Sequence, residues 1–224
     1  GMAKGSGMIH PNMATMLGFL VTDASVSSED LSAALSEVNA RTFNAISVDG
    51  DTSTNDTVIL QATGKGQSLE RGGPGWEDFI NTLEVVAQKL AFAIVSDGEG
   101  ATRTFEVGIR GTSSDEIALA AAKAVVRSPL VKTAIHGSDA NWGRIVGALG
   151  AEGVEGLGKV SICIGSHPVV SQGAPLAFDE PTLHAVMAEG HVIIEITLPG
   201  SGVGRAWGCD LGPKYISINA DYRS

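Results

Sequence analysis

The sequence predicts an α/β or α+β fold in which long amphipathic helices cover sheet. Hydrophobic residues make up 43% of the 224 residues, which is enough for a sizeable packed core. The 29 glycines cluster at the ends of apolar runs, as expected for many short elements joined by tight turns. Short apolar runs alternate along the chain with longer segments of helical spacing, so both element types are expected.

Hydrophobic periodicity and turn signals place the elements in order. Residues 1–14 have neither period and are expected to form a loop, and one compact domain is expected from Thr15 onward. Helices are predicted from capping residues 27–30 to about Arg41, over 76–94, from capping residues 113–116 to about Arg127, where Pro129 ends the helix, and near 181–188. Strands are predicted over 15–23, 57–62 and 104–109, and near 130–135, 159–164, 192–198, 203–210 and 215–218.

Charge and composition exclude several classes of protein. The net charge of −10 argues against binding nucleic acid or an anionic membrane through phosphate neutralisation. The longest uninterrupted apolar run, Leu90–Val95, is far shorter than the roughly 20 residues of a membrane span. With no charged-then-apolar leader in the sequence, a soluble cytoplasmic protein is expected. Cys163 and Cys209 could pair, but two isolated cysteines are more often free buried thiols.

Common catalytic motifs are absent from the sequence, and no metal site is expected. There is no phosphate loop and no GxSxG nucleophile elbow, and the five histidines lack metal-ligand spacing. The polar run Asp49–Asp56 has two interpretations, a solvated loop or a site for a hard cation such as Ca²⁺ or Mg²⁺. Thr15, at the junction between loop and strand, is by itself most simply structural.

Several segments, in order along nearly the whole chain, resemble one enzyme family. They are Gly1–Ile9 followed by Pro11–Leu17, then Ser47–Thr57, Ser96–Thr102, Asn141–Ile145 and Ile218–Ser224. Together they resemble the glutamate N-acetyltransferases of arginine biosynthesis, also called ornithine acetyltransferases. The resemblance implies a precursor that cuts itself between Ala14 and Thr15. Residues 1–14 would then be the tail of an α chain, and 15–224 the β chain, a single catalytic domain.

The chemistry of an amino-terminal threonine agrees with this resemblance. A threonine hydroxyl is a weak nucleophile unless a base lies beside it. Removal of Ala14 would free the α-amine of Thr15, and such amines titrate near ~7.7–8.0, so much of the amine is neutral at cytosolic pH. This amine can accept the hydroxyl proton and return it to the leaving amine. The acyl group would then be carried as an ester on Thr15.

The resemblance also implies the substrate contacts, residue by residue. Lys4 resembles the family's substrate-binding lysine, although it could be a solvated loop lysine. Glu99 resembles the residue that binds the substrate's amino group, although it could be an exposed turn residue. Asn219 and Ser224 resemble the carboxy-terminal substrate contacts; without the family they would be taken as tail. The oxyanion-hole Thr-Gly pair would belong to the α half, which this sequence lacks.

The implied reaction transfers acetyl from N2-acetyl-L-ornithine to L-glutamate. The implied fold is a layered α/β/β/α sandwich built from both chains, in an α2β2 heterotetramer. No cofactor is implied, because an amine, a hydroxyl and oxyanion donors suffice for acyl transfer. Whether acetyl-coenzyme A is also a donor stays open. The alternatives are a self-processing aminopeptidase or amidohydrolase of similar fold, and a catalytically silent subunit.

Overall fold

The computed structural model describes residues 1–10 and 16–222. The proposed cleavage site, Ala14 and Thr15, and the proposed substrate contact Ser224 therefore lie outside the described residues.

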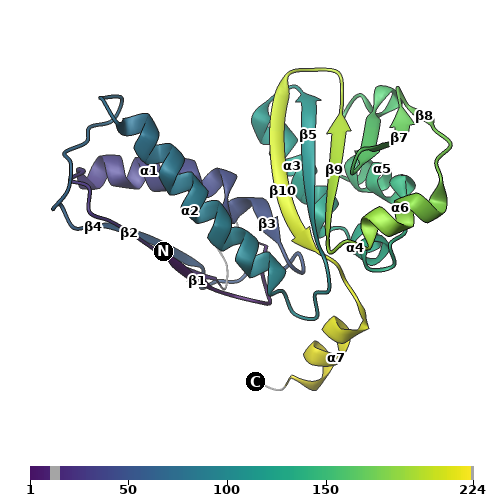
Figure 1. Cartoon of the computed structure of the whole chain (residues 1–224), viewed down its shortest axis with the longest axis horizontal. Coiled ribbons are helices and arrows are strands. Elements are labelled where there is room, and N and C mark those ends of the chain that lie inside the picture. Colours follow the sequence, from purple (N-terminus) through teal and green to yellow (C-terminus); the bar gives the residue numbers. More distant parts are fainter. Residues whose placement is uncertain (11–15, 223–224) are drawn as a thin grey trace.

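The amino-terminal part of the chain is a small sheet covered on one face by two helices (Figure 1). The sheet has the order β1-β2-β4, in which β1 is antiparallel to β2 and β2 is parallel to β4. Its elements are β1 (Met2–Lys4), β2 (Leu17–Thr22), α1 (Ser28–Arg41), β4 (Thr57–Ala62) and α2 (Trp76–Ser96). We call this part the three-stranded layer.

The remainder of the chain forms a seven-stranded sheet of order β3-β10-β5-β9-β6-β7-β8. Helices α3 to α6 pack on one face of this sheet, and α7 extends away from both sheets (Figure 1). The elements of this part, the seven-stranded layer, are β3 (Ile46–Ser47), β5 (Thr104–Thr112), α3 (Asp115–Arg127), α4 (Pro129–His136), α5 (Trp142–Ala151), β6 (Ser161–Ile164), β7 (His167–Ser171), β8 (Ala174–Pro175), α6 (Glu180–Met187), β9 (His191–Thr197) and β10 (Gly202–Cys209). Helix α7 spans Pro213–Asp221.

Strand β10 joins the two hydrophobic clusters of the chain. Ala206 belongs to the cluster under α3 and α5, together with Phe105 of β5. The next residue, Trp207, points to the opposite face and belongs to the cluster under α1 and α2. Strand β10 therefore contributes side chains to both clusters, one from each of its faces.

Helix α2 is the one helix of the described residues that is long and apolar enough to cross a membrane. A core helix of a globular protein passes the same test. The buried residues of α2 all lie in the second hydrophobic cluster, and include Trp76, Leu83 and Ile94. We therefore interpret α2 as a core helix.

Local signals account for most of the long elements. Ser27 and Ser114 accept hydrogen bonds from the backbone N–H groups of Asp30 and Ile117, so α1 and α3 begin where their capping residues predict. The predicted strand at 57–62 is β4, and the predicted strand at 104–109 lies within the longer β5. The predicted mixture of helix and sheet is confirmed.

Three predicted elements are wrong. Residues 130–135 are not a strand but lie in α4, because Ser128 caps the helix and Pro129 occupies its first turn, where a missing N–H costs nothing. Residues 215–218 are likewise helical, in α7, which begins at Pro213. The expected amino-terminal loop contains β1, which pairs with β2.

Candidate functional site

A cavity of about 850 Å³ lies where β1, the end of α2 and the end of α7 meet. Both Lys4 and Glu99 line it, as do Leu17, the first residue of β2, and Tyr222. Leu17 is two residues after Thr15. The cavity thus brings together two residues predicted as substrate contacts, beside the strand that follows the predicted nucleophile. The other lining residues are Ala3, Gly5, Ser6, Gly7, Asn55, Leu90, Ala93, Ile94 and Asp97.

Lys4 is placed by strand pairing. It is the last residue of β1 and lies opposite Leu17 in the antiparallel register with β2. Its side chain is exposed, so the ammonium group is available to a ligand in the cavity. Lys4 therefore lies in a strand and not in the loop expected for residues 1–14.

Glu99 is held in a tight turn after α2. Its backbone N–H donates to the carbonyl of Ser6 at 2.8 Å, which ties the turn to the chain just after β1. The next residue, Gly100, has a φ of +73°, and a Cβ there would lie 2.6 Å from the backbone nitrogen of Tyr215. Glycine at 100 therefore lets α7 pack directly against the turn that carries Glu99.

Asn219 lies on α7 and contacts Glu99 directly. Its side-chain Nδ2 donates to Glu99 Oε2 at 2.9 Å and to the carbonyl of Tyr215 at 3.1 Å. A strand was expected to hold Asn219; the helix holds it instead, one turn after Tyr215. Three predicted site residues from distant parts of the sequence thus meet, while Thr15 and Ser224 lie outside the described residues.

Comparison with known proteins identifies the family. The sequence model of the ArgJ family matches residues 1–224. The chain belongs to the ArgJ family. The curated relatives named "Arginine biosynthesis bifunctional protein ArgJ" include those of Oceanobacillus iheyensis and Geobacillus stearothermophilus, each 49% identical over all of this chain and 56% of the relative. The chain thus spans little more than half the length of these relatives.

A solved structure of the ArgJ family has the same fold. The crystal structure of the arginine biosynthesis bifunctional protein ArgJ from Bacillus halodurans superposes with a TM-score of 0.90 at 44% identity. The match covers 93% of this chain and 100% of the crystal chain. The predicted family and the predicted α/β fold are both confirmed.

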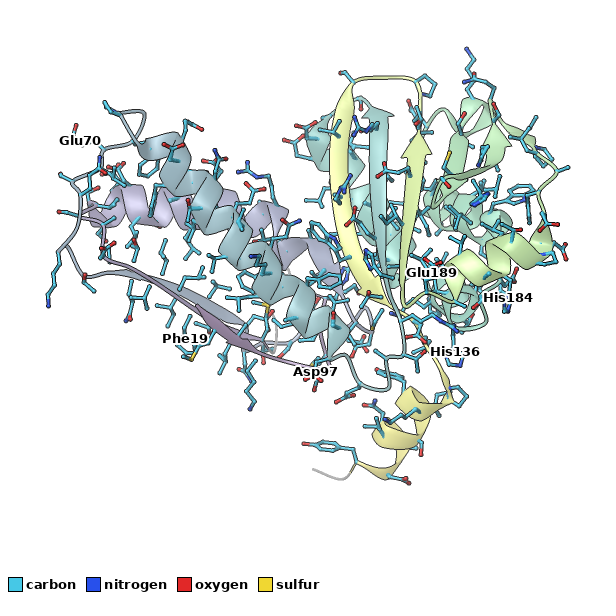
Figure 2. All side chains as sticks on the ribbon, viewed as in Figure 1. Phe19, Glu70, Asp97, His136, His184 and Glu189 are labelled. Carbon is cyan, nitrogen blue, oxygen red and sulfur yellow. The ribbon has the colours of Figure 1, made fainter. Side chains whose placement is uncertain are left out.

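A buried carboxylate ties the chain just after the Glu99 turn to the end of β10, from which the chain continues into α7 and Asn219. Asp210, at the end of β10 and 2% exposed, accepts hydrogen bonds from the backbone N–H groups of Thr102 (2.7 Å) and Arg103 (2.9 Å). It also accepts from Thr102 Oγ1 and binds His136 Nδ1, whose side chain lies near the connection to α7 (Figure 2). Burial alone would raise the pKa of Asp210, but these hydrogen bonds outweigh it and the pKa is lowered.

The polar run 49–56 is the part of this site that sequence reasoning left without a role. Asn55 lines the cavity, and Asp49 accepts a hydrogen bond from Tyr215 Oη at 3.3 Å. Burial, and then the negative charge of Asp49, raise the pKa of Tyr215 to about 12, so the phenol stays protonated. The sequence marked this run by its polar composition and as part of the family-like segment Ser47–Thr57, but not by its partners, which are distant in sequence.

Among the described residues, another cavity and the two cysteines contribute no site residue, and no cluster of metal ligands is present. A second cavity, of about 650 Å³, lies between α1, α2, the start of α3 and the seven-stranded sheet, and two of its arginines, Arg41 and Arg205, are paired with glutamates. No group of three or more His, Cys, Asp or Glu side chains in the described ranges could hold a metal ion. Cys163 and Cys209 are free thiols, as expected.

Proposed function

We propose that this chain is the catalytic β part, with the end of the α part, of an ornithine acetyltransferase. It would transfer acetyl from N2-acetyl-L-ornithine to L-glutamate in the cytoplasm. The observation that carries this proposal is the cavity, where Lys4, Glu99 and the Asn219–Glu99 hydrogen bond meet beside the start of β2. N2-acetyl-L-ornithine has one carboxylate and one side-chain ammonium group, which match this arrangement of a cation and an anion.

The proposed reaction has two halves, both using Thr15 freed by cleavage after Ala14. Thr15 Oγ bonds to the acetyl carbonyl carbon of acetylornithine, and its proton passes to the α-amine. The C–N bond of the substrate breaks, and ornithine leaves as an amine that takes up this proton. The amine of glutamate then attacks the acetyl ester, the ester bond breaks, and the Thr15 hydroxyl is restored.

Each predicted contact has a role in this reaction. Lys4 binds a substrate carboxylate, and Glu99 binds the substrate ammonium. Asn219 keeps the Glu99 carboxylate in place through its hydrogen bond, so that Oε1 stays directed to a ligand. Ser224 is proposed as a further contact from the carboxy terminus. No cofactor enters this scheme, because the groups named transfer both the acetyl group and the proton.

The three-stranded sheet leaves one face open, and we propose that the α half of the precursor covers it. This face is apolar: Met2 (69% exposed), Phe19 (40%) and Ile59 (37%) lie side by side across the three strands. Figure 2 shows Phe19 projecting from the side of the sheet opposite α1 and α2. Large apolar patches of this kind are normally covered by another surface. A second sheet packed here would complete an α/β/β/α sandwich.

The coverage of the relatives supports a two-chain enzyme. The matched crystal chain is covered completely, whereas the curated relatives are covered over 56% of their length. A protein that is cut into two chains accounts for this difference. We further propose that two such pairs form an α2β2 heterotetramer, and that residues 15–224 act as one catalytic domain.

The experiment that tests this function uses the full-length protein, expressed with the amino-terminal region that the relatives have. Intact mass should show cleavage before Thr15, and the purified protein should consume acetylornithine only when glutamate is present. Thr15→Ala should give an uncut and inactive protein, while Thr15→Ser should keep both reactions. Water-dependent cleavage of peptides without glutamate would instead identify an aminopeptidase or amidohydrolase. A parallel assay with acetyl-coenzyme A tests the second donor.

A further inference from the structure

The polar run Asp49–Asp56 binds the backbone on both sides of the segment that contains Ala14 and Thr15. Its carboxylates were open to two interpretations, a solvated loop or a cation site. In the structure they accept hydrogen bonds from backbone N–H groups of residues about forty positions earlier in the chain. Such contacts use the carboxylates as anchors for a peptide strand.

The first anchor is Asp49, which binds two successive residues before the cleavage site. Its Oδ2 accepts from the N–H of Met8 at 2.6 Å, and its Oδ1 accepts from the N–H of Ile9 at 3.0 Å. Met8 has a φ of +54°, a left-handed conformation that a non-glycine residue keeps only when its surroundings fix it. The two hydrogen bonds that one carboxylate accepts from this backbone supply that restraint.

Neighbouring groups extend this anchor to residue 10. The N–H of Val48 donates to the carbonyl of Ile9 at 2.7 Å, and Thr52 Oγ1 donates to the carbonyl of His10 at 3.0 Å. The chain before the cleavage site is therefore held up to residue 10 by residues 48–52.

The second anchor is Asp56, which binds the residue directly after Thr15. Its Oδ1 accepts a hydrogen bond from the N–H of Met16, and the N–H of Thr57 donates to the carbonyl of Met16 at 3.0 Å. The other oxygen, Oδ2, is buried and has no hydrogen-bond partner among the described residues. Burial raises the pKa of Asp56, and the hydrogen bond from Met16 partly offsets this.

We propose that residues 49–56 form a two-point clamp that fixes residues 8–10 and Met16 and so aligns the Ala14–Thr15 bond for self-cleavage. In this clamp Asp49 and Asp56 are positioning residues. The inference rests on the proposed function and deepens it. It assigns the cleavage step to a different part of the chain from the substrate contacts Lys4 and Glu99.

Cleavage depends on alignment more than acetyl transfer does. Before the cut, the nitrogen of Thr15 is an amide and cannot act as a base. Thr15 Oγ bonds to the Ala14 carbonyl carbon, the C–N bond breaks, and the hydroxyl proton ends on the Thr15 nitrogen, which becomes an amine. Water then hydrolyses the ester to give the Ala14 carboxyl group and restore the hydroxyl. Without a neighbouring amine, the rate of the first step depends on how the two reacting atoms are held.

The two anchors should differ in one respect. After the cut, the two backbone N–H groups that Asp49 binds belong to the chain that ends at Ala14, whereas Asp56 still holds Met16 beside the catalytic threonine. Loss of Asp49 should therefore slow cleavage, and should affect transfer only through its bond to Tyr215 Oη. Loss of Asp56 should slow cleavage and also acetyl transfer.

The test measures cleavage by intact mass, and transfer separately on the cut fraction, in the full-length protein. Asp49→Asn leaves one acceptor oxygen where the N–H groups of Met8 and Ile9 need one each, so cleavage should slow about ten- to a hundredfold. Transfer by the cut fraction should change no more than it does in Tyr215→Phe, which loses the same phenol bond. Asp56→Asn should slow both steps. Thr52→Val, which removes only the bond to His10, should slow cleavage by a smaller factor and tests the clamp even if Asp49→Asn does not fold.

Two matched variants serve as controls. Asp51→Asn changes an exposed carboxylate in the same run, and Tyr215→Phe removes only the phenol bond to Asp49. Both should cleave at the wild-type rate. Cleavage of Asp49→Asn, Asp56→Asn and Thr52→Val at the rate of these controls would overturn the clamp. An uncut wild-type protein, or one that transfers no acetyl, would instead reject the proposed function.

Discussion

Each of the two sheets has one face that points away from the helices of its own layer, and these faces differ in chemistry. On the three-stranded sheet the face carries Met2, Phe19 and Val21, all exposed. On the seven-stranded sheet, Arg205 of β10 pairs with Glu106 and Glu195. The first face is largely apolar, whereas the second combines these ion pairs with the exposed Ile193 and Val203.

The sequence creates the charged face through one glycine. Gly108 lies between Arg205 and Glu195 in the register of β10, β5 and β9. A Cβ at Gly108 would lie 2.6 Å from Glu195 Oε2, so the absence of a side chain lets the arginine and the glutamate meet across β5. The comparison indicates that water can solvate the ion pairs of the seven-stranded sheet, whereas the sheet that borders the candidate site exposes a row of large apolar side chains.

The largest expected effect follows from placing a charge on the apolar face. Phe19→Asp should abolish association with the amino-terminal region, because a carboxylate buried without a partner costs several kcal/mol. Since Phe19 is already 40% exposed, the melting temperature of the described chain should change little. Co-purification of the two parts by size exclusion is the measurement. Normal assembly of this variant would show that the apolar face is not the interface with the amino-terminal region.

A smaller effect is expected at the site. Glu99→Gln keeps an oxygen that can accept from Asn219 but removes the charge that faces a substrate ammonium. Loss of a charge-assisted hydrogen bond costs roughly 1.5–3 kcal/mol, so KM for acetylornithine should rise about ten- to a hundredfold. Steady-state kinetics check this, with cleavage before Thr15 as the control that should stay normal. Unchanged kinetics would make Glu99 a structural turn residue.

The stability of the chain should depend on pH through His10. Burial first, and then the positive charges of Lys123 and Arg127, lower the pKa of His10 to about 4. The unfolded chain binds this proton below about 6.5, so the unfolded state gains protons over the folded one as the pH falls. Stability should therefore be full above pH 6.5 and decline towards pH 4. Melting curves of His10→Gln should show a smaller decline than wild type; an equal decline would assign the effect to other groups.

The smallest effect is expected on the charged face. Arg205 is 43% exposed, and exposed ion pairs contribute about 0–1 kcal/mol. Arg205→Gln should therefore lower the free energy of unfolding by less than about 1 kcal/mol and leave assembly with the amino-terminal region intact. Denaturant unfolding and size exclusion measure the two quantities. Loss of assembly would show that the charged face, too, is an interface.

Local signals in the sequence predicted the long helices and the short α6, expected near 181–188, but not α4, α5 or α7. Ser27 and Ser114 cap their helices directly, so α1 and α3 could be located from the sequence. The alternating apolar pattern of 215–218 suggested a strand, but Pro213 at the first helical turn and packing against Gly100 place these residues in a helix. The predicted end of α3 at about Arg127, before Pro129, is confirmed, but the same proline also starts α4.

The candidate site was predicted through family motifs, and its geometry depends on tertiary contacts. Glu99 reaches the cavity because its N–H donates to Ser6, and Asn219 reaches Glu99 because α7 folds back onto the turn. No local pattern encodes either contact. The partners of Asp49 and Asp56 were equally hidden, since they lie about forty residues away.

The pairing of β1 with β2 becomes a contact between two polypeptides if the chain is cut before Thr15 as proposed. Met2, Ala3 and Lys4 pair with Phe19, Gly18 and Leu17 across that bond. Before the cut, the short connection keeps the two strands at a high effective concentration. After it, β1 is supplied by another polypeptide, and its retention depends on dilution and on everything else that polypeptide binds. A released peptide of residues 1–14 would dissociate at low concentration, taking Lys4 with it. The proposed α half, of which these residues would be the tail, would hold the strand, and its lysine, in place.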